Sequence, residues 1–113
     1  MSMIVGTTIF KMDGTAFYSP EFPRGGLAAT FALDVSHLVG NPTVTVTVQH
    51  RNEDETSFSD AGTFTSITTT GAKSVDVSAL KEVVRLKVEF DAGDDSTDGM
   101  HFLVMAPSWR PYS

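Results

Sequence analysis

The sequence predicts an all-β fold: a single-domain antiparallel β-sandwich of the jelly-roll type with about eight strands. Three observations lead to this prediction. Apolar and polar residues alternate along most of the chain, and the 3.6-residue period of an amphipathic helix is nearly absent. Turn-forming residues separate the alternating segments at intervals of roughly 8–12 residues. The chain has 113 residues, which suits one compact domain and leaves no room for two.

The first third of the chain contains two weak strand candidates and one clear one. Residues 4–11 and 15–18 are strand-like, and the Asp13-Gly14 pair between them is a hairpin signal. Residues 20–26 contain two prolines and two glycines, which predicts a loop. Residues 27–35 alternate clearly, and the small side chains on their second face leave room for another strand or chain.

The rest of the chain alternates more strongly. Residues 43–50 form the clearest strand, because valines occupy one face and mostly threonines the other. Residues 84–90 are amphipathic. Residues 100–105 are apolar on both faces apart from His101, which is typical of a central or covered strand. Three weaker elements complete the prediction: strands at 62–69 and 74–77, and one helical turn at 78–82.

Charge and composition narrow the classes of partner. Fourteen acidic and eight basic side chains give a formal net charge of −6. Nucleic acids and anionic membranes attract clustered Lys and Arg, so neither is an expected partner. The absence of cysteine excludes disulfides, thiol nucleophiles and thiolate metal sites. The N-terminus has no basic segment followed by an apolar run, so we expect no signal peptide and synthesis in the cytoplasm.

Residues capable of catalysis are present without a recognisable arrangement. His37, His50 and His101 are scattered, and a metal or catalytic role would need two of them close together beside a carboxylate. No serine lies in a nucleophile elbow, and Arg24-Gly25-Gly26 lacks the frame and the lysine of a phosphate-binding loop. We therefore expect neither enzymatic activity nor a cofactor.

The densest charged segment is the acidic loop at residues 91–99. Asp94, Asp95 and Asp98 are candidate ligands for calcium, because Ca²⁺ binds oxygen atoms. The spacing and the terminal Glu of an EF-hand loop are absent. The alternative is a solvated hairpin tip rich in turn-forming residues, which needs no metal ion.

Both ends of the chain are candidate partner-binding segments. In the C-terminal tail, 106–113, the candidates are Trp109, Arg110 and Tyr112, whose residue types dominate interface hot spots. The alternative is that Trp109 folds back and covers the core. In the N-terminal arm, 1–11, the candidates are Met3, Ile4 and Val5. A strand from this arm would add to the edge of a neighbour's sheet through main-chain hydrogen bonds.

Several short segments of the second half resemble a known group of proteins. In chain order they are Val48-Gln49-His50-Arg51-Asn52-Glu53, Ser57-Phe58, Ala61-Gly62-Thr63-Phe64, Val77-Ser78-Ala79-Leu80-Lys81-Glu82-Val83-Val84-Arg85 and Ala106-Pro107-Ser108-Trp109. Together they span roughly residues 43–112 and are similar to small all-β virion proteins of tailed bacteriophages and related gene-transfer particles. The acidic loop is longer than the turn expected at its place in this pattern.

The resemblance implies a virion structural protein, above all a head decoration (cement) protein on the capsid exterior. Such a protein binds the major capsid protein, reinforces the shell against internal DNA pressure and has no catalytic residues. We also expect self-association into a small homo-oligomer. Two other functions stay open. A carbohydrate-binding β-sandwich module would stack sugars on exposed rings, with Trp109, Tyr18, Tyr112 and Phe22 as candidates. A minor head or tail connector component would differ in its copy number per particle.

Overall fold

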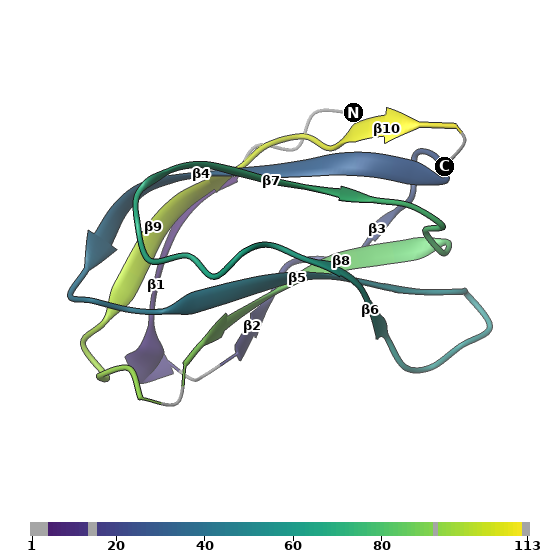
Figure 1. Ribbon diagram of the computed structural model, residues 1–113. Coiled ribbons are helices and arrows are strands. Elements are labelled where there is room, and N and C mark those ends of the chain that lie inside the picture. The colour runs from purple at the N-terminus through teal and green to yellow at the C-terminus, as the bar shows by residue number, and fades with distance from the viewer. Residues whose placement is uncertain (1–4, 14–15, 92, 112–113) are drawn as a thin grey trace.

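The computed structural model describes residues 5–13, 16–91 and 93–111, and its architecture is the predicted all-β sandwich (Figure 1). Two five-stranded antiparallel sheets pack face to face. The strands are β1 (Val5–Phe10), β2 (Ala16–Tyr18), β3 (Phe22–Pro23), β4 (Ala28–Val39), β5 (Val44–Arg51), β6 (Ser59–Thr63), β7 (Gly71–Val77), β8 (Val83–Phe90), β9 (Gly99–Val104) and β10 (Ser108–Arg110). One short 3-10 helix, Lys11–Asp13, follows β1. Within these described ranges, no helix is long and apolar enough to cross a membrane.

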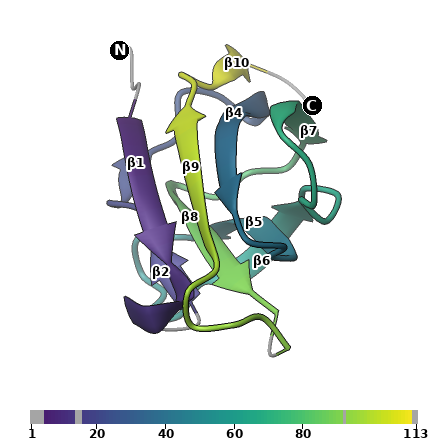
Figure 2. The same ribbon diagram turned by 90° about the vertical axis from the view of Figure 1, so that its left-hand side faces the viewer.

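The first sheet is built around β4, which pairs with β7 along one edge. The other edge of β4 therefore holds both β9 and β10, one after the other. β9 ends at Val104 and β10 begins at Ser108, so they behave as one strand interrupted at Pro107, which cannot donate to the sheet. β9 also pairs with β1, which forms the margin of this sheet (Figure 2).

The second sheet has the order β2-β8-β5-β6, with β3 beside β2 on the same edge of β8. β5 and β8 pair over their full length, from Val44 opposite Phe90 to Arg51 opposite Val83. Their alternating patterns coincide in this register, so apolar side chains of both strands face the first sheet together. The intervening polar side chains form the outer face of the second sheet.

The core lies between the two sheets. Val44, Val46 and Val48 of β5 are fully buried, and they belong to one cluster with Phe31 and Leu33 of β4. Burying an apolar side chain of this size contributes about 1.5–3 kcal/mol. The alternation that predicted these strands is therefore the pattern that builds the core.

Three connections differ from the prediction. Asp13-Gly14 does not join a hairpin, because β1 pairs with β9 in one sheet and β2 pairs with β8 in the other. The helical turn predicted at 78–82 is replaced by an irregular connection with bends at Ala79 and Glu82, in which Ala79 has a φ of 55°. In the predicted strand 62–69, β6 ends at Thr63 and Ile67 forms an isolated bridge with Val44. In each case the outcome depends on pairing with residues distant in sequence.

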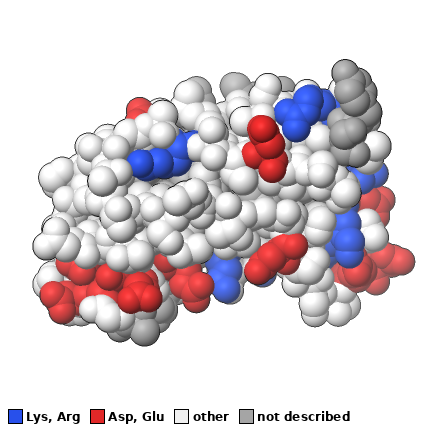
Figure 3. Space-filling model, in the orientation of Figure 1, with Lys and Arg blue, Asp and Glu red and all other residues white. Residues whose placement is uncertain are grey.

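Charged side chains are concentrated at the two ends of the face shown in Figure 3. Acidic residues gather at the lower left, where Figure 1 places the connection from β8 to β9, and again at the right-hand end, where the connection from β5 to β6 lies. Between the two ends, separate patches of both signs are scattered over the surface (Figure 3). The second of these ends borders the site described next.

Candidate functional site

The outer face of the second sheet carries four side chains that we call the arginine–aromatic cluster: Tyr18, Arg51, Phe58 and Arg85. The guanidinium carbon of Arg85 lies 4.2 Å from the centre of the Tyr18 ring and 3.9 Å from the centre of the Phe58 ring. The guanidinium carbon of Arg51 lies 5.2 Å from the centre of the Phe58 ring. All three distances are within the range of about 6 Å for cation–π attraction.

Strand register brings these residues together. Arg85 occupies an outward position of β8, and Tyr18 at the end of β2 lies opposite Lys87 of the same strand. Arg51 ends β5 and Phe58 immediately precedes β6, so both depend on the β5–β6 connection. The cluster thus joins three neighbouring strands, β2, β8 and β5, and one loop of the second sheet.

Gln49 lies beneath the cluster and holds Arg85 in place. Its side chain is buried, its Oε1 atom accepts a hydrogen bond of 2.9 Å from Arg85 Nε, and its Nε2 atom donates one of 3.0 Å to Asp60 Oδ1. Both ends of this buried amide are therefore satisfied. Arg85 is anchored through Nε, and in the described part of the chain it has no ion pair with a carboxylate.

An open depression of about 610 Å³ adjoins the cluster. Its lining comes from Glu21, Arg51, Glu55, Thr56, Ser57, Phe58 and Arg85. Arg51 is engaged there, because its Nη2 atom lies 3.4 Å from Glu21 Oε1 and its Nη1 atom donates to three carbonyls of the β5–β6 connection. Arg85 is thus the arginine of the depression whose terminal nitrogens are available for an acidic group.

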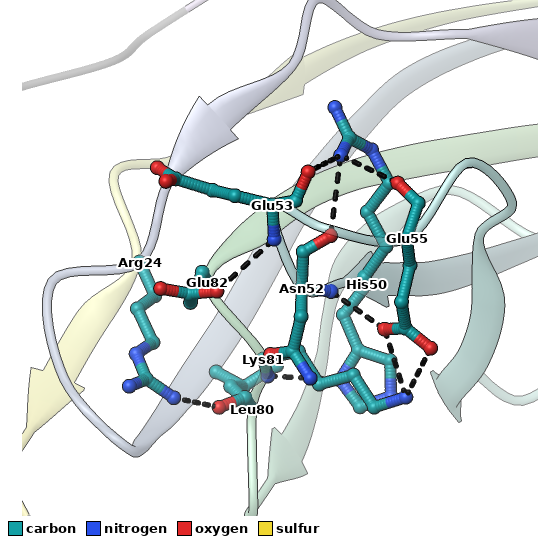
Figure 4. A network of polar contacts seen from close by, with 9 residues as sticks. Arg24, His50, Asn52, Glu53, Glu55, Leu80, Lys81 and Glu82 are labelled. Carbon is teal, nitrogen blue, oxygen red and sulfur yellow. Dashed lines mark hydrogen bonds and ion pairs between the residues drawn. The ribbon is translucent and has the colours of Figure 1, made fainter.

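A network of polar contacts supports the loop that carries Phe58 (Figure 4). The carboxylate of Glu55 accepts a hydrogen bond of 2.7 Å from the Asn52 amide and one of 3.2 Å from Lys81 Nζ. The Glu53 amide donates to Glu82 Oε1 at 3.0 Å. These bonds join the β5–β6 connection to the β7–β8 connection. The pKa of Glu55 lies below its usual value, first because of the Asn52 hydrogen bond and then because of Lys81.

His50 forms the base of this network. It is buried, and its Nδ1 atom accepts a hydrogen bond of 3.2 Å from the Lys81 amide (Figure 4). Accepting this bond requires an unprotonated Nδ1. Burial lowers the pKa of His50, and the positive charge of Lys81 lowers it further. The neutral imidazole is therefore a structural acceptor that ties the β7–β8 connection to β5.

The structure resolves the alternatives for the C-terminal tail in part. Trp109 lies in β10, opposite Ala29 of β4, and packs edge-to-face on Phe31 and Phe22 with ring centres 5.9 and 6.4 Å apart. It covers the core, as the alternative prediction held. Arg110 donates a hydrogen bond of 3.1 Å to Thr30 Oγ1. Tyr112 lies outside the described residues, and a partner-binding role for Arg110 stays a prediction.

The described part of the predicted N-terminal arm is not a free arm but part of the sandwich, and its addition to a neighbour's sheet stays a prediction. Met3 and Ile4 lie outside the described residues. Val5 begins β1, whose six residues all pair with β9 of the same chain. The segment is thus an edge strand of the first sheet, held by main-chain pairing with β9.

Carboxylates of the acidic loop accept hydrogen bonds from backbone amides of the loop and of the β4–β5 connection. The Asp94 carboxylate accepts hydrogen bonds of 3.1 Å from the amides of Thr43 and Asp91, and the buried Asp98 carboxylate accepts one of 2.9 Å from the Asp95 amide. Among the described residues, no group of three or more His, Asp or Glu is placed to hold a metal ion. Asp94, Asp95 and Asp98 are thus not gathered into such a group, and calcium binding by this loop stays a prediction. The hairpin alternative is wrong, because β8 and β9 belong to different sheets.

Two of the three histidines lie opposite each other on neighbouring strands. His37 of β4 lies opposite His101 of β9, and His101 Nδ1 lies 2.5 Å from Thr8 Oγ1 of β1. The row crosses three strands of the first sheet, and His37 and His101 are both exposed. His101 makes hydrogen bonds with the hydroxyls of Thr8 and Ser36, and among the described residues no carboxylate joins the two histidines in a metal-holding group.

Sequence reasoning did not identify Arg85 or Phe58 as site residues. The outward position of Arg85 was visible from the β8 pattern, but its contact with Phe58 depends on the path of the β5–β6 loop. The chain matches no protein-family model, and comparison with curated proteins and with solved structures gives no significant match.

Proposed function

We propose that this protein is a non-enzymatic virion structural protein, a head decoration protein that binds the major capsid protein on the outer surface of a phage-type particle. One observation carries the proposal. The segments that resemble phage virion proteins supply Arg51, Phe58 and Arg85 of the arginine–aromatic cluster and also His50 and Lys81 of the network beneath it. Residues spread over a large part of the chain thus serve one exposed surface.

The chemistry of this surface suits recognition of an acidic group. A guanidinium can bind a carboxylate through two parallel hydrogen bonds, and Arg and Tyr are common hot-spot residues. The two rings hold the Arg85 side chain in place before the partner arrives, which reduces the entropy lost on binding. A shell repeats each such contact many times, so a modest single contact can give stable attachment through avidity.

Co-sedimentation with head particles that lack this protein tests the proposal. We expect saturable binding at a fixed number of sites, which also separates a decoration protein from a minor head or tail connector. The Arg85→Ala variant should bind at least about tenfold more weakly. Lys87→Ala is the matched control, because Lys87 is a cation on the same outer face and is already paired with Glu89. Protein that stays in solution at micromolar concentration, or equal losses in both variants, would count against the proposal.

A carbohydrate-binding module is the second candidate, because Tyr18 is 53% exposed and lies beside Arg85. An exposed ring with an adjacent guanidinium suits a sugar that carries a carboxylate. Titration with neutral and uronic-acid-containing oligosaccharides, followed by NMR, distinguishes this candidate. Binding that disappears in Arg85→Ala supports it, and no shift at about 10 mM sugar excludes it.

A further inference from the structure

β1 is the least protected sheet edge in the described part of the chain. Sheet edges are usually blocked by charges, prolines or short length, because unpaired backbone groups recruit other strands. β7 carries Lys73 and Asp76, and β6 has five residues including Asp60. β2, β3 and β10 have only three, two and three residues, β3 contains Pro23 and β10 contains Arg110. β1 has six residues with no charge and no proline.

The outer edge of β1 presents three residues for pairing. The Lys11 amide donates to the Asp98 carbonyl, so Lys11 faces β9. Backbone groups alternate in direction along a strand, which turns Val5, Thr7 and Ile9 toward β9 as well. Gly6, Thr8 and Phe10 therefore direct their N–H and C=O groups away from the sheet. No described strand pairs with that edge (Figure 2).

We propose that a second copy of this chain pairs with β1 in an antiparallel arrangement, with the two-fold axis at Thr8. Thr8 of one copy then lies opposite Thr8 of the other, and Gly6 lies opposite Phe10. In this register, the outward N–H and C=O groups of the two strands form about six main-chain hydrogen bonds. The two first sheets become one continuous sheet. The inference goes beyond the proposed function and does not depend on it.

Two observations show that a second copy fits this edge, whose six residues carry no charge to oppose a copy of themselves. The outward residues Gly6, Thr8 and Phe10 are spaced symmetrically about Thr8. The edge can therefore pair with a copy of itself, as a two-fold interface requires. The acidic loop lies at one end of β1, where Phe10 is opposite Gly99. An antiparallel pair keeps the two acidic loops at opposite ends of the joint, whereas a parallel pair would bring them together. The antiparallel dimer is thus compatible with a net charge of −6 on each chain.

Sedimentation equilibrium of the full chain tests this inference. We expect the wild type to be a dimer, and Thr8→Pro to weaken the dimer at least about tenfold, because each copy loses an outward N–H. Proline fits an edge strand when its N–H faces outward, so the fold should persist. Thr8→Val is the matched control: it also loses the contact with His101 but keeps the N–H, and it should remain a dimer.

Circular dichroism melting shows whether each variant folds. If Thr8→Pro does not fold, Thr8→Lys gives the same answer, because it retains the N–H and places two like charges opposite each other at the axis. A wild type that is monomeric at about 100 µM would overturn the inference. So would a dimer that survives in both Thr8→Pro and Thr8→Lys. A monomeric wild type whose particle binding is lost in Thr8→Pro would instead show that a particle protein, and not a second copy, occupies the edge.

Discussion

His50 shows how a single residue links the stability of the domain to its candidate site. Its neutral imidazole accepts a hydrogen bond from the amide of Lys81, whose side chain in turn bonds Glu55 in the loop that carries Phe58. Protonation would place an N–H opposite another N–H in a buried position, which is unfavourable. The residue therefore connects solution pH to the geometry of the arginine–aromatic cluster.

We predict that acidification destabilises the protein through His50. Because the pKa of His50 is lowered in the folded state, the unfolded state takes up the proton first as the pH falls below the usual value of 6.5. The free energy of unfolding should decrease by up to about 1.4 kcal/mol per pH unit in that window. Glu55, whose pKa is also lowered, adds a further loss below its usual value of 4.5.

Urea unfolding at pH 7.5 and 5.5 measures this effect. The His50→Gln variant keeps a hydrogen-bond acceptor for the Lys81 amide and cannot titrate. Its stability should change less than that of the wild type between these two pH values. Equal changes in both proteins would assign the acid sensitivity to other groups and contradict the role given to His50.

At the scale of single elements, β10 turns the C-terminal segment from a tail into part of the sandwich. Trp109 covers Phe31 and Phe22, and a side chain on Gly25 would meet its ring at 2.8 Å. Trp109→Ala should lower the free energy of unfolding by about 2–4 kcal/mol in urea titrations, because a partly buried ring leaves a cavity. Arg110→Ala keeps the strand and should cost less than about 1 kcal/mol. An unchanged stability of Trp109→Ala together with lost particle binding would restore its role as a partner contact.

Long strands can be predicted from their own sequence, whereas short strands and strand partners depend on residues distant in the chain. β5 and β8 were predicted because alternation is local and their Val, Leu and Phe residues must all face one core. β3 and β10 are too short to show a pattern, and they are strands only because β8 and β4 offer free edges. The predicted hairpin failed for the related reason that a turn signal does not reveal which sheet each strand joins.

The candidate site belongs to the scale of the whole molecule. Its outward residues on β8 could be predicted, but Tyr18, Phe58 and Gln49 come together only through the β2-β8-β5-β6 order and the path of one loop. Sequence spacing carries no information about such a convergence. The same limit applies to the β1 edge, since an edge strand is defined by its missing neighbour.

Salt dependence tests whether the dimer forms through the uncharged β1 edge. Two chains of net charge −6 repel each other, and the screening length falls from about 30 Å at 0.01 M salt to about 8 Å at 0.15 M. β1 contains no charged residue, so salt reduces the repulsion without weakening the main-chain hydrogen bonds. The dimer should therefore tighten several-fold over this range in sedimentation equilibrium. A dimer that weakens with added salt would be held by ion pairs between charged side chains, and pairing through β1 would then not explain the association.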